Sequence, residues 1–121
     1  LGRHVATEHD GRFADVVDAA GSSAVALVHT LNSWDSFADT SGYDGITVPF
    51  LKRAKIAAAD LSRAGVAAFR DLDRLTMFAD NLVPHVLRLD GLLSYDPVLL
   101  QRIERGELIE HGSREEVEIR A

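Results

Sequence analysis

Apolar residues recur at helical spacing along most of this chain, and this periodicity constrains the fold more than any other feature. Ala24, Leu27, Val28 and Leu31 follow the spacing i, i+3, i+4, i+7, which places them on one face of a helix. Runs in which β-branched residues alternate with polar ones, the pattern of a half-buried strand, are scarce. The sequence therefore predicts an all-α fold, a compact helical array.

Capping residues and prolines mark where these helices begin. Ser22 and Ser23 are N-cap candidates for the helix that contains Ala24, and Asp96 followed by Pro97 is an N-cap with proline at the first helical position. The expected helical segments are residues 13–20, 24–31, 49–61, 71–78, 84–89 and 97–105. Between Asn32 and Val48 the pattern breaks down, and we expect a loop that is held in place by its aromatic side chains.

The last residues carry a further helix-start signal. Ser113 with Glu116 three residues later is a capping-box pattern, so a final helix is expected to begin there and to continue past Ala121. The chain also begins at Leu1 rather than at a methionine. We therefore expect residues 1–121 to be a single α-helical domain from a longer chain, without that chain's N- and C-terminal segments.

Composition excludes several classes of function. With 13 basic and 19 acidic residues the formal charge is −6, so long nucleic acids are not expected partners. Cysteine is absent, which excludes disulfides and thiolate metal sites and leaves the cytoplasm as the default location. No apolar window is long enough to cross a bilayer, and the five histidines lack metal-ligand spacing. Neither a membrane nor a metal is therefore expected.

Asp80 is the main candidate for chemistry. It lies between an apolar run and the helix that Pro84 is expected to open. An aspartate there is most often a helix cap or a solvated side chain. The functional alternative is a partly buried carboxylate that stabilises positive charge while a glycosidic bond breaks. Phe78, two residues earlier, is placed to stack on a flat base.

Lys52, Arg53 and Lys55 form a short cationic run near an expected helix start. Backbone N–H groups at a helix start also favour anions, so this run suits the phosphate of a nucleotide. The alternative is a solvated helix face whose cations pair with neighbouring acids such as Asp60. On charge statistics alone the alternative is the more common arrangement.

Five sequence blocks resemble, in the same order, those of the queuosine salvage protein family. They are Gly21-Ser22-Ser23-Ala24, residues 50–60 around Lys-Arg-Ala, Leu75-Thr76-Met77-Phe78-Ala79-Asp80 with Pro84, residues 91–95, and residues 112–120 with Glu-Val-Glu-Ile-Arg. The chain departs from the family pattern at Asn81, Leu82 and His85, where the family usually has Tyr, Arg and Gln, and at Leu51 and Lys55, where it has an aromatic residue and Gln. The resemblance runs through nearly the whole chain.

The resemblance implies a function, a fold and a set of site residues. Members hydrolyse the N-glycosidic bond of queuosine 5'-monophosphate and release queuine for transfer RNA modification, and for this chain we expect neither a metal nor an organic cofactor. Their helical fold is similar to that of helix-hairpin-helix DNA glycosylases. Asp80 matches the catalytic aspartate, as nucleophile or electrostatic stabiliser, Phe78 a base-contacting position, and Lys52 a substrate-binding lysine.

Two other functions remain open from the residues. One is a nucleic-acid-binding helical module related to the glycosylase fold, which the acidic balance disfavours. The other is a non-catalytic helical interaction domain in which Asp80 only caps a helix. The oligomeric state is not encoded in any pattern of the chain.

Overall fold

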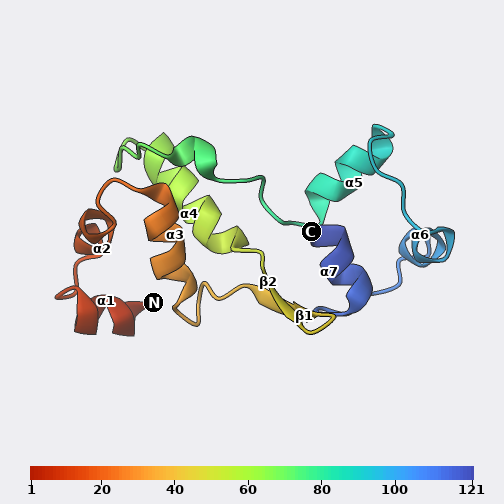
Figure 1. Cartoon of the computed structure of the whole chain (residues 1–121), viewed down its shortest axis with the longest axis horizontal. Coiled ribbons are helices and arrows are strands. Elements are labelled where there is room, and N and C mark those ends of the chain that lie inside the picture. Colours follow the sequence, from red (N-terminus) through yellow and green to blue (C-terminus); the bar gives the residue numbers. More distant parts are fainter. The chain divides into compact units, whose positions relative to one another are not determined.

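The computed structural model describes all residues, 1–121, which form seven α-helices, one short 3-10 helix and a two-stranded antiparallel sheet (Figure 1). The residues group into two compact units. The first unit contains Leu1–Asp39 and Leu51–Phe78, and the second unit contains Thr40–Phe50 and Ala79–Ala121. The prediction of an all-α fold is wrong because of the sheet, and nothing in the structure supports the likeness to helix-hairpin-helix glycosylases.

The first unit is built around an apolar core. Its elements are α1 (Gly2–Glu8), α2 (Phe13–Ala19), α3 (Ala24–Asn32), α4 (Lys52–Arg63) and the 3-10 helix η1 (Leu72–Arg74). The predicted stripe Ala24, Leu27, Val28 and Leu31 is buried, which confirms that α3 faces the core. Trp34 is also buried and packs with these residues, so one aromatic of the expected loop belongs to the core.

The start of α3 is held by side chains from two parts of the first unit. The Ser23 hydroxyl accepts a hydrogen bond from the Ala26 N–H at 3.1 Å, which confirms Ser23 as the N-cap. Asp71, just ahead of η1, accepts from the Ala24 N–H at 2.6 Å and from the Ser23 hydroxyl at 2.7 Å. These hydrogen bonds lower the pKa of the Asp71 carboxyl, and the bond from the Ser23 hydroxyl contributes most to the shift. Local and distant groups together thus satisfy the first turn of α3.

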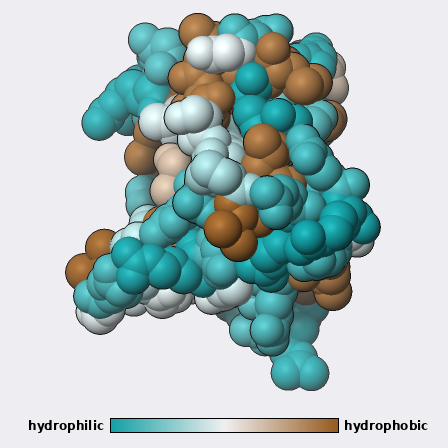
Figure 2. All heavy atoms as spheres, turned by 90° about the vertical axis from the view of Figure 1, so that its right-hand side faces the viewer, coloured by the Kyte–Doolittle hydropathy of each residue, from teal (hydrophilic) through white to brown (hydrophobic).

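The second unit combines a hairpin with three short helices. Its elements are β1 (Thr40–Tyr43), β2 (Ile46–Pro49), α5 (Leu82–Leu89), α6 (Pro97–Glu104) and α7 (Arg114–Arg120). The predicted cap of α6 is confirmed, because the Asp96 carboxylate accepts from the Val98 and Leu99 N–H groups at 2.9 and 3.2 Å. Many large apolar side chains on α5, α6 and the following loops are exposed, and Figure 2 shows them lying among hydrophilic ones.

The expectation of a loop over residues 32–48 is wrong for its second half, which forms a β-hairpin. Its strands pair from Thr40 with Pro49 to Tyr43 with Ile46, and Asp44-Gly45 connects them. Both connecting residues have positive φ, 46° and 82°, as a tight hairpin turn requires. Asp-Gly is a strong hairpin signal, but the flanking residues do not show the alternation of a strand. The sheet was therefore missed although its turn is visible in the sequence.

Several helix boundaries also differ from the sequence predictions. Pro49 ends β2 instead of starting a helix, and α4 begins only at Lys52, after Leu51 has adopted a left-handed conformation with φ of 60°. Residues 71–78 contain only the single turn η1, and α1 was not predicted. Pro84 lies inside the first turn of α5, where a missing N–H is tolerated. No helix has the length and apolar content that a membrane span needs.

Candidate functional site

The Asp80 carboxylate is fixed at the start of α5. Its Oδ1 accepts hydrogen bonds from the Leu82 N–H at 2.6 Å and the Val83 N–H at 3.2 Å. The helix itself begins at Leu82, so Asp80 satisfies two of its free N–H groups from two residues upstream. The residue is half-buried. The capping role that the residue pattern suggested is therefore present, and it holds the carboxylate in one orientation.

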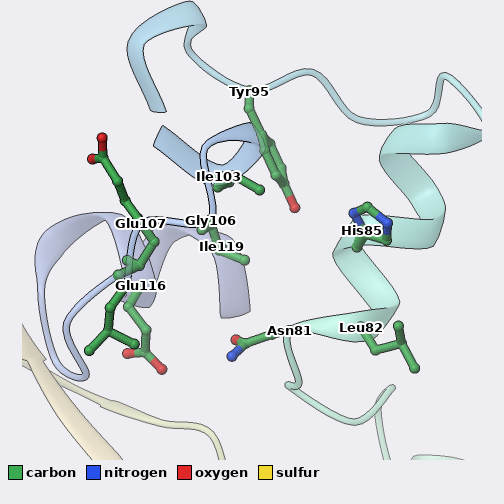
Figure 3. Close-up of a pocket in the computed structure, with 11 residues that line it drawn as sticks. Asn81, Leu82, His85, Tyr95, Ile103, Gly106, Glu107, Glu116 and Ile119 are labelled. Carbon is green, nitrogen blue, oxygen red and sulfur yellow. The ribbon is translucent and has the colours of Figure 1, made fainter. Parts of the chain in front are cut away.

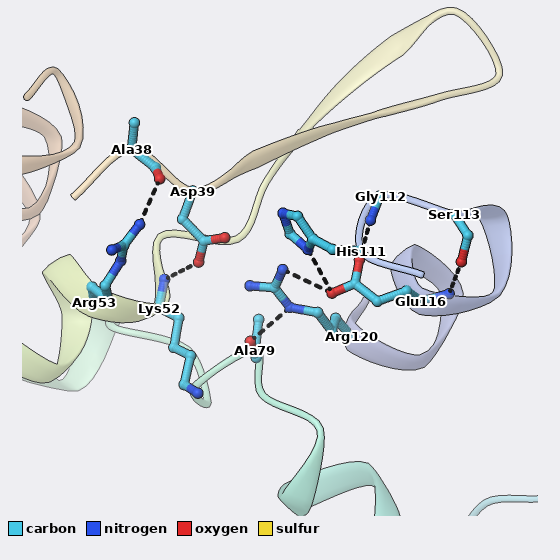
Figure 4. A network of polar contacts seen from close by, with 10 residues as sticks. All are labelled: Ala38, Asp39, Lys52, Arg53, Ala79, His111, Gly112, Ser113, Glu116 and Arg120. Carbon is cyan, nitrogen blue, oxygen red and sulfur yellow. Dashed lines mark hydrogen bonds and ion pairs between the residues drawn. The ribbon is translucent and has the colours of Figure 1, made fainter. Parts of the chain in front are cut away.

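A buried arginine contacts the backbone immediately before Asp80. Arg120, the last residue of α7, donates from Nε to the Ala79 carbonyl oxygen at 3.1 Å. Its Nη1 lies 3.2 Å from Glu116 Oε1, and its guanidinium carbon lies 4.0 Å from the centre of the Phe50 ring. Only 7% of the Arg120 side chain is exposed. Figure 4 shows this guanidinium between Ala79 and Glu116.

Glu116 carries the negative charge of this ion pair. Its side chain is 9% exposed, and it accepts from the Gly112 N–H at 3.1 Å in addition to the contact with Arg120. His111 Nδ1 lies 3.4 Å from the same carboxylate (Figure 4). Burial acts to raise the pKa of Glu116, but the hydrogen bonds from these three residues outweigh it, and the pKa is lowered. The carboxylate is therefore stabilised in its charged form.

The predicted capping box of α7 is only half formed. The Ser113 hydroxyl accepts from the Glu116 N–H at 3.3 Å, as the pattern predicts. The Glu116 carboxylate, however, bonds to the N–H of Gly112 instead of that of Ser113. Because it also pairs with Arg120, this glutamate connects the start of α7 with its end.

A second cluster attaches α7 to the hairpin at the surface. Arg114 donates to the Glu118 carboxylate at 2.9 Å and to the Tyr43 hydroxyl at 3.0 Å, and the Tyr43 hydroxyl donates to Glu118. The guanidinium also lies 5.1 Å from the centre of the Tyr43 ring. The hydrogen bond to Glu118 is the main reason why the pKa of the Tyr43 hydroxyl is raised. Exposed contacts thus join β1 to α7.

A largely apolar cavity of about 620 Å³ lies in the second unit. Figure 3 shows Asn81, His85, Tyr95 and Glu116 around it. The other lining residues are Leu82, Ile103, Gly106, Glu107, Leu108, Ile109 and Ile119. Asp80 is not a lining residue, but the next residue along the chain is. Asn81, Leu82 and His85, from the cap and first half of α5, thus all line this cavity.

The cationic run at the start of α4 has partners within the first unit. The Asp39 carboxylate accepts from the Lys52 backbone N–H at 3.0 Å, and Arg53 donates to the Ala38 carbonyl oxygen at 3.1 Å (Figure 4). The Asp39 carboxylate thus already occupies the start of α4, where the sequence pattern suited the phosphate of a nucleotide. Lys52 as a substrate-binding residue stays a prediction.

Lys55 lies on the buried face of α4. It is buried, and its ammonium group donates to the Thr76 hydroxyl at 2.8 Å. Burial lowers the pKa of this ammonium group, and the charge of Asp39 opposes the shift only in part. The run Lys52, Arg53 and Lys55 therefore does not present one cationic surface.

The predicted site residues fall in both units. Lys52 and half-buried Phe78 belong to the first unit, whereas Asp80 belongs to the second. Sequence reasoning missed Arg120, whose contact with Ala79 spans 41 positions and leaves no local pattern. Nowhere in the chain do three or more His, Asp or Glu side chains gather as metal ligands would.

Comparison with known proteins agrees with the resemblance that the sequence blocks indicated. The family model described as queuosine salvage protein matches residues 1–121. A protein of Sphaerobacter thermophilus named queuosine 5'-phosphate N-glycosylase/hydrolase is 49% identical over 125 residues, covering 99% of this chain and 39% of that protein. Proteins with the same name from Bos taurus and Schizosaccharomyces pombe are 36% and 32% identical, and each alignment covers 98% of this chain and 36% of the relative.

The match over the whole chain defines its family. The chain is a mostly helical protein with a carboxylate fixed ahead of the short helix α5 and a largely apolar cavity in the same unit. This chain belongs to the queuosine salvage protein family. It spans less than two fifths of the length of the curated relatives described above.

Proposed function

We propose that this chain contributes the reactive carboxylate of a hydrolase that cleaves the N-glycosidic bond of queuosine 5'-monophosphate. The observation that carries the proposal is the family match over residues 1–121, together with relatives named for this activity. The product would be queuine, which is reused in transfer RNA modification. The substrate is a small nucleotide, and the reaction needs neither a metal nor an organic cofactor.

The chemistry asks for a fixed negative charge beside the sugar. When the bond between the ribosyl carbon and the base nitrogen breaks, the electron pair leaves with the base and the sugar becomes positively charged. A carboxylate either stabilises this charge or forms a bond with the carbon before water attacks. Water then supplies the hydroxyl group of the sugar and the proton of the base.

Asp80 is the proposed carboxylate for this step. Two backbone N–H groups hold its Oδ1, so the side chain is oriented before substrate arrives. Preorganised charge stabilises a transition state more than charge that must first reorient. Phe78 as a base-contacting residue and Lys52 as a substrate-binding residue are further parts of the proposal.

A non-catalytic interaction domain is the second candidate, because the hydrogen bonds to Leu82 and Val83 already give Asp80 a structural role. Exchange of Asp80 for Asn separates the two functions. Asn caps a helix nearly as well as Asp, but it cannot offset positive charge. We expect Asp80→Asn to fold normally and to release queuine at least ~10²-fold more slowly.

The matched control is Asp96→Asn. Asp96 caps α6 with the same pattern of two N–H donors, so it reports what the exchange does to a cap alone. Each full-length variant is incubated with queuosine 5'-monophosphate, and the release of queuine is measured by chromatography. Equal turnover in Asp80→Asn and Asp96→Asn would reject the catalytic role of Asp80. Base specificity is tested by measuring whether adenosine or guanosine monophosphate is cleaved in place of queuosine 5'-monophosphate.

A further inference from the structure

Hydrogen bonds hold Asp80 through the residues that follow it and through the residue that precedes it. The contact with the preceding residue comes from Arg120. Downstream, Oδ1 accepts from the Leu82 and Val83 N–H groups. Upstream, the Ala79 carbonyl oxygen accepts from Arg120 Nε at 3.1 Å. Because the peptide group is planar, a bond that orients this carbonyl also orients the N–H of Asp80 and the direction in which its Cα lies. Arg120 therefore acts on the backbone that carries the carboxylate.

Arg120 is well suited to this task because it is itself immobilised. Its guanidinium is paired with Glu116 at 3.2 Å, lies 4.0 Å from the centre of the Phe50 ring, and belongs to a side chain that is 7% exposed. A guanidinium presents several donors in one rigid plane, so it can contact a carbonyl, a carboxylate and an aromatic face at once. A lysine ammonium cannot reproduce that combination.

We propose that Arg120 is a positioning residue that sets the orientation of the Asp80 carboxylate through the Ala79 carbonyl. The inference rests on the proposed function, in which this carboxylate faces the reacting sugar. Glu116 also takes part in this positioning, since it holds Nη1 of the guanidinium whose Nε contacts Ala79. Misplacement of a reacting group by about 1 Å lowers a rate by about 10²-fold, so a residue without substrate contact is able to control turnover.

The test measures kcat and KM for base release in Arg120→Lys and Arg120→Ala. We expect kcat to fall by ~10- to 100-fold in Arg120→Ala and less in Arg120→Lys. The KM should change little, because the substrate contacts are retained. Guanidinium ion at millimolar concentration should restore part of the kcat of Arg120→Ala, whereas the same concentration of urea should not.

The control for a general loss of stability is Val117→Ala. Val117 is 1% exposed in the same helix, and its exchange weakens α7 without removing a contact to Ala79. We expect Val117→Ala to unfold at lower temperature and to keep the kcat of the folded protein. If Val117→Ala loses kcat as Arg120→Ala does, the effect belongs to the helix and the inference is overturned.

The outcomes also separate this inference from the proposed function. A wild-type protein that releases no base overturns both. An active wild type and an inactive Asp80→Asn, together with an Arg120→Ala of unchanged kcat, overturn the positioning role alone. The backbone amide resonance of Asp80 gives a readout without substrate: we expect it to shift in Arg120→Lys and to stay in place in Val117→Ala, and an unshifted resonance in Arg120→Lys contradicts the inference.

Discussion

Ten buried apolar residues form one continuous cluster in the first unit, whereas the second unit buries few apolar side chains, among them Phe50, Pro84 and Val117. Its interior contains instead the charged pair Glu116 and Arg120, and α6 has no buried residue at all. The first unit is therefore stabilised mainly by removal of apolar surface from water. In the second unit hydrogen bonds and caps carry more of the stability, so pH and single polar exchanges should affect it more strongly.

The largest expected effect comes from the core of the first unit. Leu27 is fully buried in α3, and Leu27→Ala leaves a cavity that costs about 2–5 kcal/mol of unfolding free energy. Trp34 is the only tryptophan of the chain and lies in the same core, so its fluorescence in a urea titration reports this loss. Val66→Ala, at a side chain that is 66% exposed, should leave the midpoint almost unchanged. Similar losses in both variants would show that this core does not dominate.

A smaller effect is expected from the charged pair of the second unit. Glu116→Gln removes the charge that faces Arg120 and leaves a buried guanidinium without its carboxylate. The expected loss is about 1–3 kcal/mol of unfolding free energy, measured by urea titration followed by circular dichroism. A loss below the error of the titration would mean that this pair is not a main support of the second unit.

The same pair predicts a dependence on pH with a defined sign. The pKa of Glu116 in the folded protein lies below the ordinary carboxyl value of 4.5, so the stability it contributes is fully present above that value. It is lost as the pH falls through the lower folded-state pKa. The difference in unfolding free energy between the wild type and Glu116→Gln should therefore be constant from neutral pH down to about pH 5. Below that pH the difference should shrink, and a constant difference down to pH 3 would contradict the assignment.

The smallest effect is expected at the cap of α6. Asp96→Ala removes the acceptor of two N–H groups in a helix without a buried residue, at a cost of about 1 kcal/mol. Asp96→Asn keeps a capping oxygen and should be close to neutral. Hydrogen exchange of the first amides of α6 measures the difference locally. Equal protection in the two variants would show that something other than this cap holds α6.

Sequence reasoning succeeded where the signal lies within a few residues. The stripe of α3 and the caps Ser23 and Asp96 were predicted, because periodicity and capping depend on neighbours along the chain. It failed where a distant partner changes a local preference. Pro49 is able to start a helix, but pairing with Thr40 makes it the end of a strand.

The candidate site shows the same limit. The position of Asp80 ahead of a helix could be inferred, and its capping bonds to Leu82 and Val83 agree with that position. The partner of the Ala79 carbonyl could not be inferred, because Arg120 reaches it across 41 positions. Whether Asp80, Phe78 and Lys52 act on one substrate stays a prediction.

The amino-acid order was sufficient for most of the helices, for the family and for the candidate aspartate, since these depend on local spacing and on blocks of residues that can be read directly. The three-dimensional fold was needed to show that Thr40–Tyr43 pairs with Ile46–Pro49 and that buried Arg120 reaches the Ala79 carbonyl oxygen. The physical reason is that burial and ion pairing depend on which distant groups meet, whereas caps and helical faces depend on neighbours a few residues away.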